Sequence, residues 1–122
     1  MPAASRGAMI PIRTLQKRAD FVRLNRAHKS VTPYFILRSG PSGEPGCRVG
    51  YTVTTKCGNA VIRNRIKRRL RALVRELLPT AARDGYDYVF IAIAHAKPNS
   101  AEVAMPLLRE AMQRALAHSV RA

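Results

Sequence analysis

The sequence has few aromatic residues, few acidic residues and few cysteines. Its 122 residues include no tryptophan, three phenylalanines, four tyrosines and two cysteines. Cys47 and Cys57 stand ten positions apart in a segment with the pattern of one extended strand, which would separate them by roughly 30 Å. We therefore expect no disulfide between them, and two lone thiols do not make a zinc site.

Long apolar runs are also missing. No segment approaches the roughly 18 to 20 consecutive apolar residues of a membrane span, and the first 30 residues lack the apolar stretch of a signal peptide. We expect a cytoplasmic protein with no membrane partner. The length allows one domain with a modest core, which we assign to residues 14–120, preceded by a flexible basic arm over residues 1–13.

Side chains for catalysis are not grouped in the sequence. The three histidines, His28, His95 and His118, are far apart, and no pair of carboxylates or Cys–His pair stands at a recognisable spacing. We expect no catalytic residue and no metal-binding residue in this chain.

Basic residues, by contrast, are abundant and unevenly distributed. The chain has 22 Lys and Arg against 7 Asp and Glu, a net charge of +15. Residues 1–75 carry all of that excess, whereas residues 76–122 are balanced. Such polarity is typical of proteins that bind nucleic acid by releasing counterions from phosphates. Arginine outnumbers lysine, which favours structured RNA over a membrane surface, since arginine both pairs with phosphate and stacks on bases.

Hydrophobic periodicity indicates six elements in the order helix, strand, strand, helix, strand, helix. The pattern predicts helices over 15–27 with Thr14 as N-cap, over 59–78 with Asn59 as N-cap, and over 102–120 with Pro106 in the first turn. Strands are expected over 31–39, 48–55 and 86–94, the first two forming an antiparallel pair. The last strand is apolar throughout and should be covered on both faces. This order predicts an α+β fold, a two-layer sandwich.

The helix over 59–78 separates apolar and basic side chains. On a helical wheel, one arc of about 80° is apolar and contains Ile62, Ile66, Leu70, Leu73 and Leu77. The opposite arc of about 100° contains Asn64, Lys67, Arg68, Arg71 and Arg75. A solvated helix face is the ordinary interpretation of such a run. Here only Glu76 is near enough to compensate, and like charges at i and i+4 destabilise the free helix, so we favour a bound polyanion.

The segment with the most specific pattern is Lys56–Arg71, KCGNAVIRNRIKRRLR. It resembles the signature of the bacterial ribonuclease P protein, in particular through Gly-Asn-Ala-Val and Arg-Asn-Arg. The resemblance extends from about Ile12 to Ala117 and includes the segments LQKRADF (15–21), RVG (48–50) and DYV (87–89). Two positions depart from the family pattern: Asn25 stands where an aromatic is frequent, and Thr55 where a lysine is frequent.

The resemblance implies a fold and two binding regions. The fold would be that of the second domain of ribosomal protein S5, with a left-handed βαβ crossover, which is otherwise rare. Contacts to a catalytic RNA would come from Lys56, Asn59, Arg63, Asn64, Arg65, Lys67, Arg68, Arg71 and Arg75. A cleft for the single-stranded leader of the substrate would be lined by Phe21, Asn25, Ile36, Arg38 and Thr52. Stacking on Phe21 suits a strand of no fixed sequence, although plain core packing is the alternative for this ring.

The function implied is that of the protein subunit of ribonuclease P, which removes the 5′ leader from precursor tRNA. The partners would be the catalytic RNA, in a 1:1 complex, and the leader, with Mg²⁺ held mainly by the RNA. Charge and composition alone leave a structural ribosomal protein open. A free-standing protein nuclease is less favoured, because its acidic metal ligands would be few and dispersed.

Overall fold

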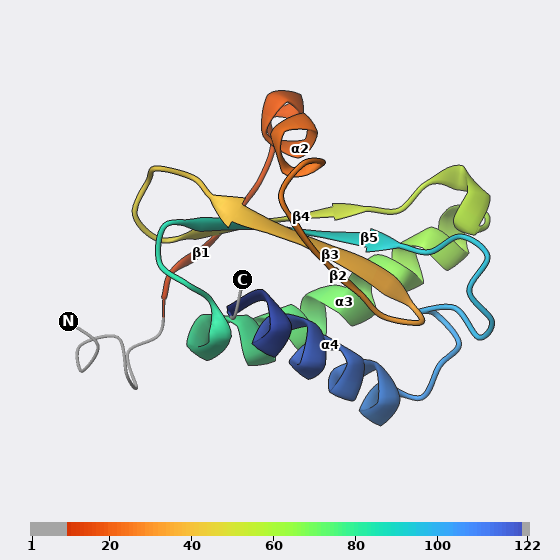
Figure 1. The fold of residues 1–122 in the computed structure, drawn as a ribbon. Helices are drawn as coiled ribbons and strands as arrows, with labels where there is room; N and C mark the ends of the chain where they lie inside the picture. Colours follow the sequence, from red (N-terminus) through yellow and green to blue (C-terminus); the bar gives the residue numbers. More distant parts are fainter. Residues whose placement is uncertain (1–9, 121–122) are drawn as a thin grey trace.

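A five-stranded sheet forms the centre of the computed structural model, which describes residues 10–120 (Figure 1). Its strands are β1 (Ile12–Thr14), β2 (His28–Val31), β3 (Phe35–Pro41), β4 (Cys47–Thr52) and β5 (Tyr86–Ala92). Their order is β1-β4-β5-β3-β2. β5 is parallel to β4 and antiparallel to β3, while β1 is parallel to β4 and β2 antiparallel to β3.

The predicted pairing between the segments 31–39 and 48–55 is wrong, because β5 lies between them. The apolar pattern of β5 explains this position. A strand that is buried on both faces lies in the middle of a sheet, and Tyr88, Val89 and Phe90 are all buried.

Three helices cover the two faces of the sheet. α3 (Ala60–Ala81) and α4 (Met105–Val120) lie against one face, and the short α2 (Arg18–Leu24) lies over the other (Figure 1). A 3₁₀ turn, η1 (Thr55–Cys57), follows β4. In the view of Figure 1, β4 is behind β5 and α3 runs beneath both, so the β4–α3–β5 connection between parallel strands is left-handed. The expected α+β sandwich and its crossover are confirmed, with α2 as a partial third layer.

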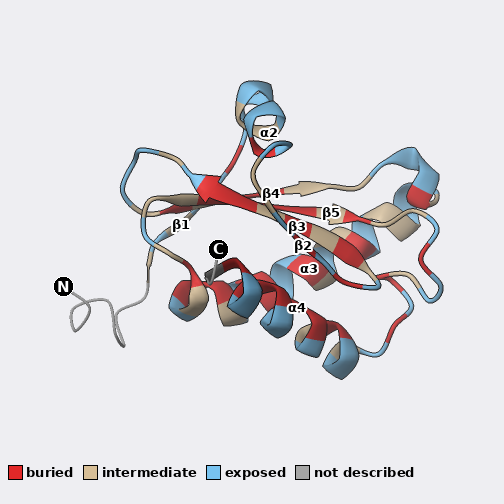
Figure 2. Cartoon of the chain, viewed as in Figure 1, coloured by how far each residue is buried: buried red, intermediate tan, exposed pale blue. Residues whose placement is uncertain are grey.

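The main core lies between the sheet and the helix pair α3/α4. Figure 2 shows both helices buried where they face the sheet and exposed on their outer sides. The predicted apolar arc of α3 has this position: Ile66, Leu70 and Leu73 are buried, while Ile62 and Leu77 pack at the margin. From the sheet, the core receives Phe35, Leu37, Val49, Tyr88 and Phe90. A smaller cluster of Leu15, Leu24 and Val89 lies beneath α2.

Two predictions near the N-terminus are wrong. The arm expected over 1–13 extends too far, because Ile12 already pairs with Cys47 of β4; residues 1–9 lie outside the described part of the chain. Thr14 ends β1 and caps no helix; α2 begins after Lys17, which makes no side-chain cap. The reason is a tertiary contact: the Leu15 amide donates to the Val49 carbonyl at 2.9 Å and extends the pairing with β4.

The strand expected over 31–39 is divided into β2 and β3 by a turn at Thr32–Tyr34. Thr32 stabilises this turn, since its hydroxyl donates to the Phe35 carbonyl at 2.7 Å and accepts from the Phe35 amide at 3.0 Å. Pro33, which cannot donate to a ladder, lies within the turn. The strand expected over 48–55 stops at Thr52, where the chain turns toward η1.

The other two helix boundaries are close to the prediction. Asn59 caps α3 as expected, its Oδ1 accepting from the Ile62 amide at 3.0 Å. α3 continues past the predicted end at Leu78 to Ala81, with Pro79 inside its last turn. Proline removes one amide donor there, where only a few residues of helix remain. Pro106 lies in the first turn of α4, as predicted. No helix in residues 10–120 is long and apolar enough to cross a membrane.

Candidate nucleic-acid interface

The outer side of α3 carries a row of basic side chains that we call the α3 basic face. Its exposed members are Asn64, Arg65, Arg68, Arg71 and Arg75, and Lys67 is half-buried. One of them, Arg71, is also held over the ring of Tyr51, 5.7 Å from the ring centre. Glu76 pairs with Arg109 of α4, at 2.9 Å between Oε2 and Nε. The one nearby acid therefore neutralises an arginine of α4, and the positive charges of the α3 basic face are not neutralised by it.

The N-terminal end of α3 adds three predicted residues to this surface. Lys56 is exposed on η1, and Asn59 is exposed while its side chain caps the helix. Arg63 is half-buried, and its Nε donates to the Gly58 carbonyl at 3.2 Å. Gly58 has a φ of 143°, a conformation that favours glycine. The nine residues predicted to contact RNA thus lie on η1 and α3, along one continuous segment of chain.

Arg68 stands between two hollows on this side of the molecule. One, of about 500 Å³, is lined by Val61, Asn64, Lys67, Arg68 and Arg71. The other, of about 540 Å³, is formed by Arg65, Arg68 and Arg69 with residues 101–104 of the loop before α4. A phosphate in either hollow would meet several positive side chains.

Arg69 has a different role from its neighbours. Its Nη1 donates to the Ser100 carbonyl at 2.9 Å, its Nη2 donates to the Val103 carbonyl, and its Nε lies 3.3 Å from the sulfur of Met105. Burial and the charge of Arg65 lower the pKa of Arg69. Arg69 therefore fastens the loop before α4 to α3.

A groove of about 620 Å³ lies on the opposite face of the sheet, between α2 and strands β3, β4 and β5; we call it the α2 groove. Four of the five residues predicted for the leader cleft line it: Phe21, Asn25, Arg38 and Thr52. Ile36 does not; it pairs with Ile91, which does. The lining also includes Gln16, Arg18, Val22, Leu24, Val89 and Ile91. Val89 and Ile91 escaped prediction because the apolar run of β5 has no alternation that would assign a face.

Two residues give the groove its chemical character. Arg38 donates from Nη1 to the Ala27 carbonyl at 3.0 Å, while its Nε is buried and has no hydrogen-bond partner within residues 10–120. Phe21 is half-buried at the edge of the cluster beneath α2. A groove with an aromatic ring, an arginine, an amide and a hydroxyl can hold a base by stacking and a phosphate by charge.

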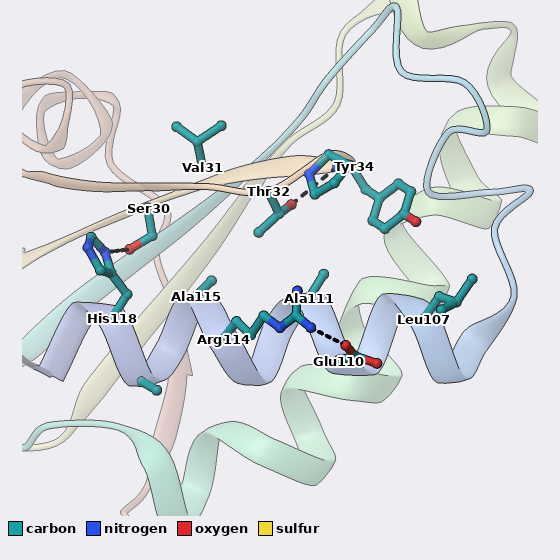
Figure 3. Close-up of a pocket in the computed structure, with 12 residues that line it drawn as sticks. Ser30, Val31, Thr32, Tyr34, Leu107, Glu110, Ala111, Arg114, Ala115 and His118 are labelled. Atoms are coloured by element: carbon teal, nitrogen blue, oxygen red, sulfur yellow. Dashed lines mark hydrogen bonds and ion pairs between the residues drawn. The ribbon is translucent and has the colours of Figure 1, made fainter.

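A further hollow of about 560 Å³ lies between β2 and α4 (Figure 3). Its charged side chains, Arg114 and Glu110, pair with each other. His118 accepts or donates a hydrogen bond with the Ser30 hydroxyl at 2.9 Å. Since its charges are balanced, this hollow does not extend the basic surfaces.

The donor set of the described residues does not fit a metal site of this chain's own. No three His, Cys, Asp or Glu side chains within residues 10–120 are grouped to hold an ion. Burial, followed by the charges of Asp87 and Asp84, raises the pKa of Cys47 to about 12, so that its thiol is protonated at neutral pH.

The chain resembles known proteins over nearly the whole described region. Residues 10–119 match the family model described as Ribonuclease P. The ribonuclease P protein component of Ruegeria pomeroyi is 45% identical over 93 residues, which cover 74% of each chain. That of Erythrobacter litoralis is 47% identical over 77 residues, which cover 63% of this chain but only 64% of the relative, a little under two thirds of its length.

Solved structures show the same architecture. The RNase P protein from Thermotoga maritima superposes with a TM-score of 0.72 at 25% identity, covering 85% of this chain and 94% of that one. The RNase P protein of Staphylococcus aureus gives a TM-score of 0.71 at 25% identity, covering 87% and 94%.

Proposed function

The chain belongs to the ribonuclease P protein family, and from that membership we propose that it is the RNA-binding subunit of a ribonucleoprotein that removes the 5′ leader from precursor tRNA. The RNA subunit carries the catalysis, and this chain contributes binding and positioning. We place the complex in the bacterial cytoplasm, with one protein per RNA.

The observation that carries this proposal is the presence of two distinct surfaces on opposite faces of one sheet. The α3 basic face has the charge density and exposure to bind the phosphates of a folded RNA. The α2 groove has the aromatic ring and the arginine to hold a single strand. One protein with both surfaces can bind the catalytic RNA and, at the same time, a leader that has no fixed sequence.

Mg²⁺ in this assembly is held mainly by phosphates of the RNA. The acidic side chains near the α2 groove support this assignment, because Asp20 and Asp87 are engaged by Arg23 and Arg48. A metal ion there would compete with four ion pairs. Both surfaces belong to one domain, which includes β1 from Ile12 onward.

The test is reconstitution from purified parts. RNA-free protein should leave a 5′-labelled precursor tRNA intact at any Mg²⁺ concentration, and addition of a bacterial ribonuclease P RNA should give cleavage at the mature 5′ end. The RNA that copurifies with a tagged chain should be a single species of a few hundred nucleotides.

Two outcomes contradict the proposal and identify its rivals. Copurification of ribosomal RNA alone indicates a structural ribosomal protein. Cleavage by RNA-free protein that is lost when Asp87 or another acidic residue is replaced indicates a protein nuclease.

A further inference from the structure

Four charged side chains form a network between α2 and the sheet. At its centre is Asp87 of β5, which has no exposed surface. Its carboxylate accepts from Nε of Arg48 at 2.9 Å and from Nη2 of the same residue at 2.7 Å. It also accepts from Nη2 of Arg23 on α2. Arg48 and Asp87 stand directly opposite each other on the paired strands β4 and β5, so one buried carboxylate joins two strands and a helix.

The network holds α2 at two points one turn apart. Arg23 reaches Asp87, and its Nη1 donates to the carbonyl of Pro41, at the end of β3, at 2.7 Å. Asp20 lies 3.4 Å from Nη1 of Arg48, measured to its Oδ2. The hydrogen bond to Asp87 raises the pKa of Arg48 above its ordinary value. α2 is thereby tied to three strands, through Asp20 and Arg48, which are largely shielded from water, and through Arg23, whose side chain is 40% exposed.

The ties and the groove are on opposite flanks of α2. On a helical wheel of about 100° per residue, Asp20 and Arg23 fall on one flank, and Arg18 and Asn25 on the other. Phe21 and Leu24 lie between them, toward the sheet. Asp20, Arg23, Arg48 and Asp87 are not among the residues that line the α2 groove. Their effect on a strand in the groove must therefore be exerted through the position of α2.

A helix of this size needs such external support. α2 has seven residues and no side-chain N-cap, and isolated helices this short do not persist in water. The apolar cluster beneath it has only three fully buried members, Leu15, Leu24 and Val89. The apolar contacts beneath α2 are non-directional and do not fix its orientation. The hydrogen bonds from Arg23 to Asp87 and to the Pro41 carbonyl have a defined geometry, and they fix where the end of α2 lies.

We propose that Asp87 is a positioning residue for the α2 groove: through Arg23 and Arg48 it sets where α2 lies on the sheet, and so the width of the groove between Phe21 and Arg38. The proposal rests on the proposed function, because it takes a single-stranded leader as the occupant. It assigns to the Arg23, Arg48 and Asp20 side chains a role in leader affinity without contact to RNA.

The first experiment compares Arg23→Gln with Arg26→Gln in the full chain. Both remove one positive charge near the end of α2, but Arg26 is exposed and makes no ion pair within residues 10–120. In the free protein, Arg23→Gln should speed hydrogen exchange of the α2 amides by about tenfold, while α3 amides and the α2 amides of the Arg26→Gln control keep the wild-type rate.

The second measurement uses the holoenzyme and two precursors, one with a long leader and one with a single leader nucleotide. Arg23→Gln should lower affinity for the first by about fivefold and leave the second, and the affinity for the RNA subunit, unchanged. Unchanged α2 exchange, or equal losses for both precursors, overturns the proposal.

Asp87→Asn separates positioning from direct contact. If Arg23 contacted RNA itself, freeing it from Asp87 would leave or raise leader affinity. If Asp87 positions α2, then Asp87→Asn should lower affinity for the long-leader precursor as Arg23→Gln does, and leave the short-leader precursor unchanged. The double variant should bind the long-leader precursor no more weakly than the weaker of the two single variants. Asp20→Asn replaces Asp87→Asn if the latter does not fold, because the side chain of Asp20 is 18% exposed.

The proposed function and this inference fail differently. A wild-type holoenzyme that binds both precursors equally contradicts the leader role of the groove. The exchange rates of α2 still decide whether the Asp87 network holds the helix.

Discussion

Phe21 combines a packing contact and a groove contact in one side chain. Its ring lies against Gly50 of β4, where an added Cβ would stand 2.6 Å from the ring carbon Cζ. A side chain at position 50 would therefore displace the ring. Glycine there lets the ring lie close to the sheet while it still lines the α2 groove. Both the core-packing and the base-stacking interpretation of Phe21 have a structural basis, and affinity measurements can separate them.

Replacement of Phe21 by alanine should weaken the binding of long-leader precursors to the holoenzyme by about 1 to 3 kcal/mol, the range for stacking of one base on an aromatic side chain. A precursor with a one-nucleotide leader should be unaffected. Because the ring is only half-buried, unfolding free energy should fall by less than the roughly 3 to 5 kcal/mol of a fully buried phenylalanine. Equilibrium binding and thermal melting measure the two quantities.

Phe35→Ala is the control for a fully buried ring of the same kind. Phe35 is buried in the main core and does not line the α2 groove, so its truncation should lower stability by roughly 3 to 5 kcal/mol and impair both precursors alike. If Phe21→Ala follows the pattern of this control, Phe21 is a packing residue and the groove lacks an aromatic anchor.

At the scale of elements, α3 has two kinds of arginine next to each other. Arg68 is exposed between two hollows of the α3 basic face. Arg69 bonds the carbonyls of Ser100 and Val103 and fastens the loop before α4. The sequence shows a run of basic residues without distinguishing them, because adjacent positions on a helix differ in direction by about 100°.

Arg68→Ala and Arg69→Ala should therefore affect different quantities, the first RNA affinity and the second folding stability. Arg68→Ala should weaken binding to the RNA subunit and make the slope of log affinity against log salt shallower by roughly 0.7 to 0.9 per lost phosphate contact. Arg69→Ala should leave that slope unchanged and lower the unfolding free energy by roughly 1 to 3 kcal/mol, since it removes charged hydrogen bonds to backbone carbonyls. A slope that changes with Arg69 but not with Arg68 would reverse these assignments.

Elements with strong local signals could be predicted from the sequence, and those defined by partners could not. The 3.6-residue period and the Asn59 cap located α3, and the apolar run located β5. β1 has three residues and exists only because β4 pairs with it. The strands that pair with β5 could not be predicted, because this pairing joins segments distant in sequence and no local pattern contains it.

The two surfaces of the candidate site also differ in how far the sequence predicts them. The α3 basic face follows from one helix and its period. The α2 groove combines residues of four elements, and its predicted lining came from family resemblance. Ile36, the residue that does not line it, stands near the start of β3, two positions before Arg38. The Asp87 network escaped prediction altogether, because Asp20, Arg23, Arg48 and Asp87 have no common spacing.

At the scale of the whole molecule, the net charge is +15, and the acidic residues near the groove, Asp20 and Asp87, form ion pairs with Arg23 and Arg48. Within residues 10–120, five of the seven acidic side chains pair with arginines outside the α3 basic face: Asp20, Glu44, Glu76, Asp87 and Glu110. Self-repulsion of such a charge favours a polyanionic partner, whichever surface it meets first.

At alkaline pH, two buried acidic groups of the core, the Cys47 thiol and the Tyr88 hydroxyl, keep protons that the unfolded chain loses. Burial raises the pKa of Cys47 from 9.0 to about 12, with added contributions from Asp87 and Asp84. Burial also raises the pKa of Tyr88 from 10.0 to about 12, against a hydrogen bond from the Arg83 amide that lowers it. Between pH 9 and 12 the unfolded chain thus binds fewer protons at these two groups than the folded one. Their contribution to stability should therefore be fully present below pH 9 and fall as pH rises through this window. One pKa unit corresponds to about 1.4 kcal/mol, which gives a loss of roughly 3 kcal/mol from Cys47 and roughly 1 kcal/mol from Tyr88 by pH 11.

Urea unfolding from pH 8 to pH 11 measures this loss of unfolding free energy. In the control variant Cys47→Ala, the decline should begin near pH 10 instead. If Cys47→Ala and the wild type lose stability in parallel from pH 9, then the thiol of Cys47 is not the group that links folding to the proton in that range.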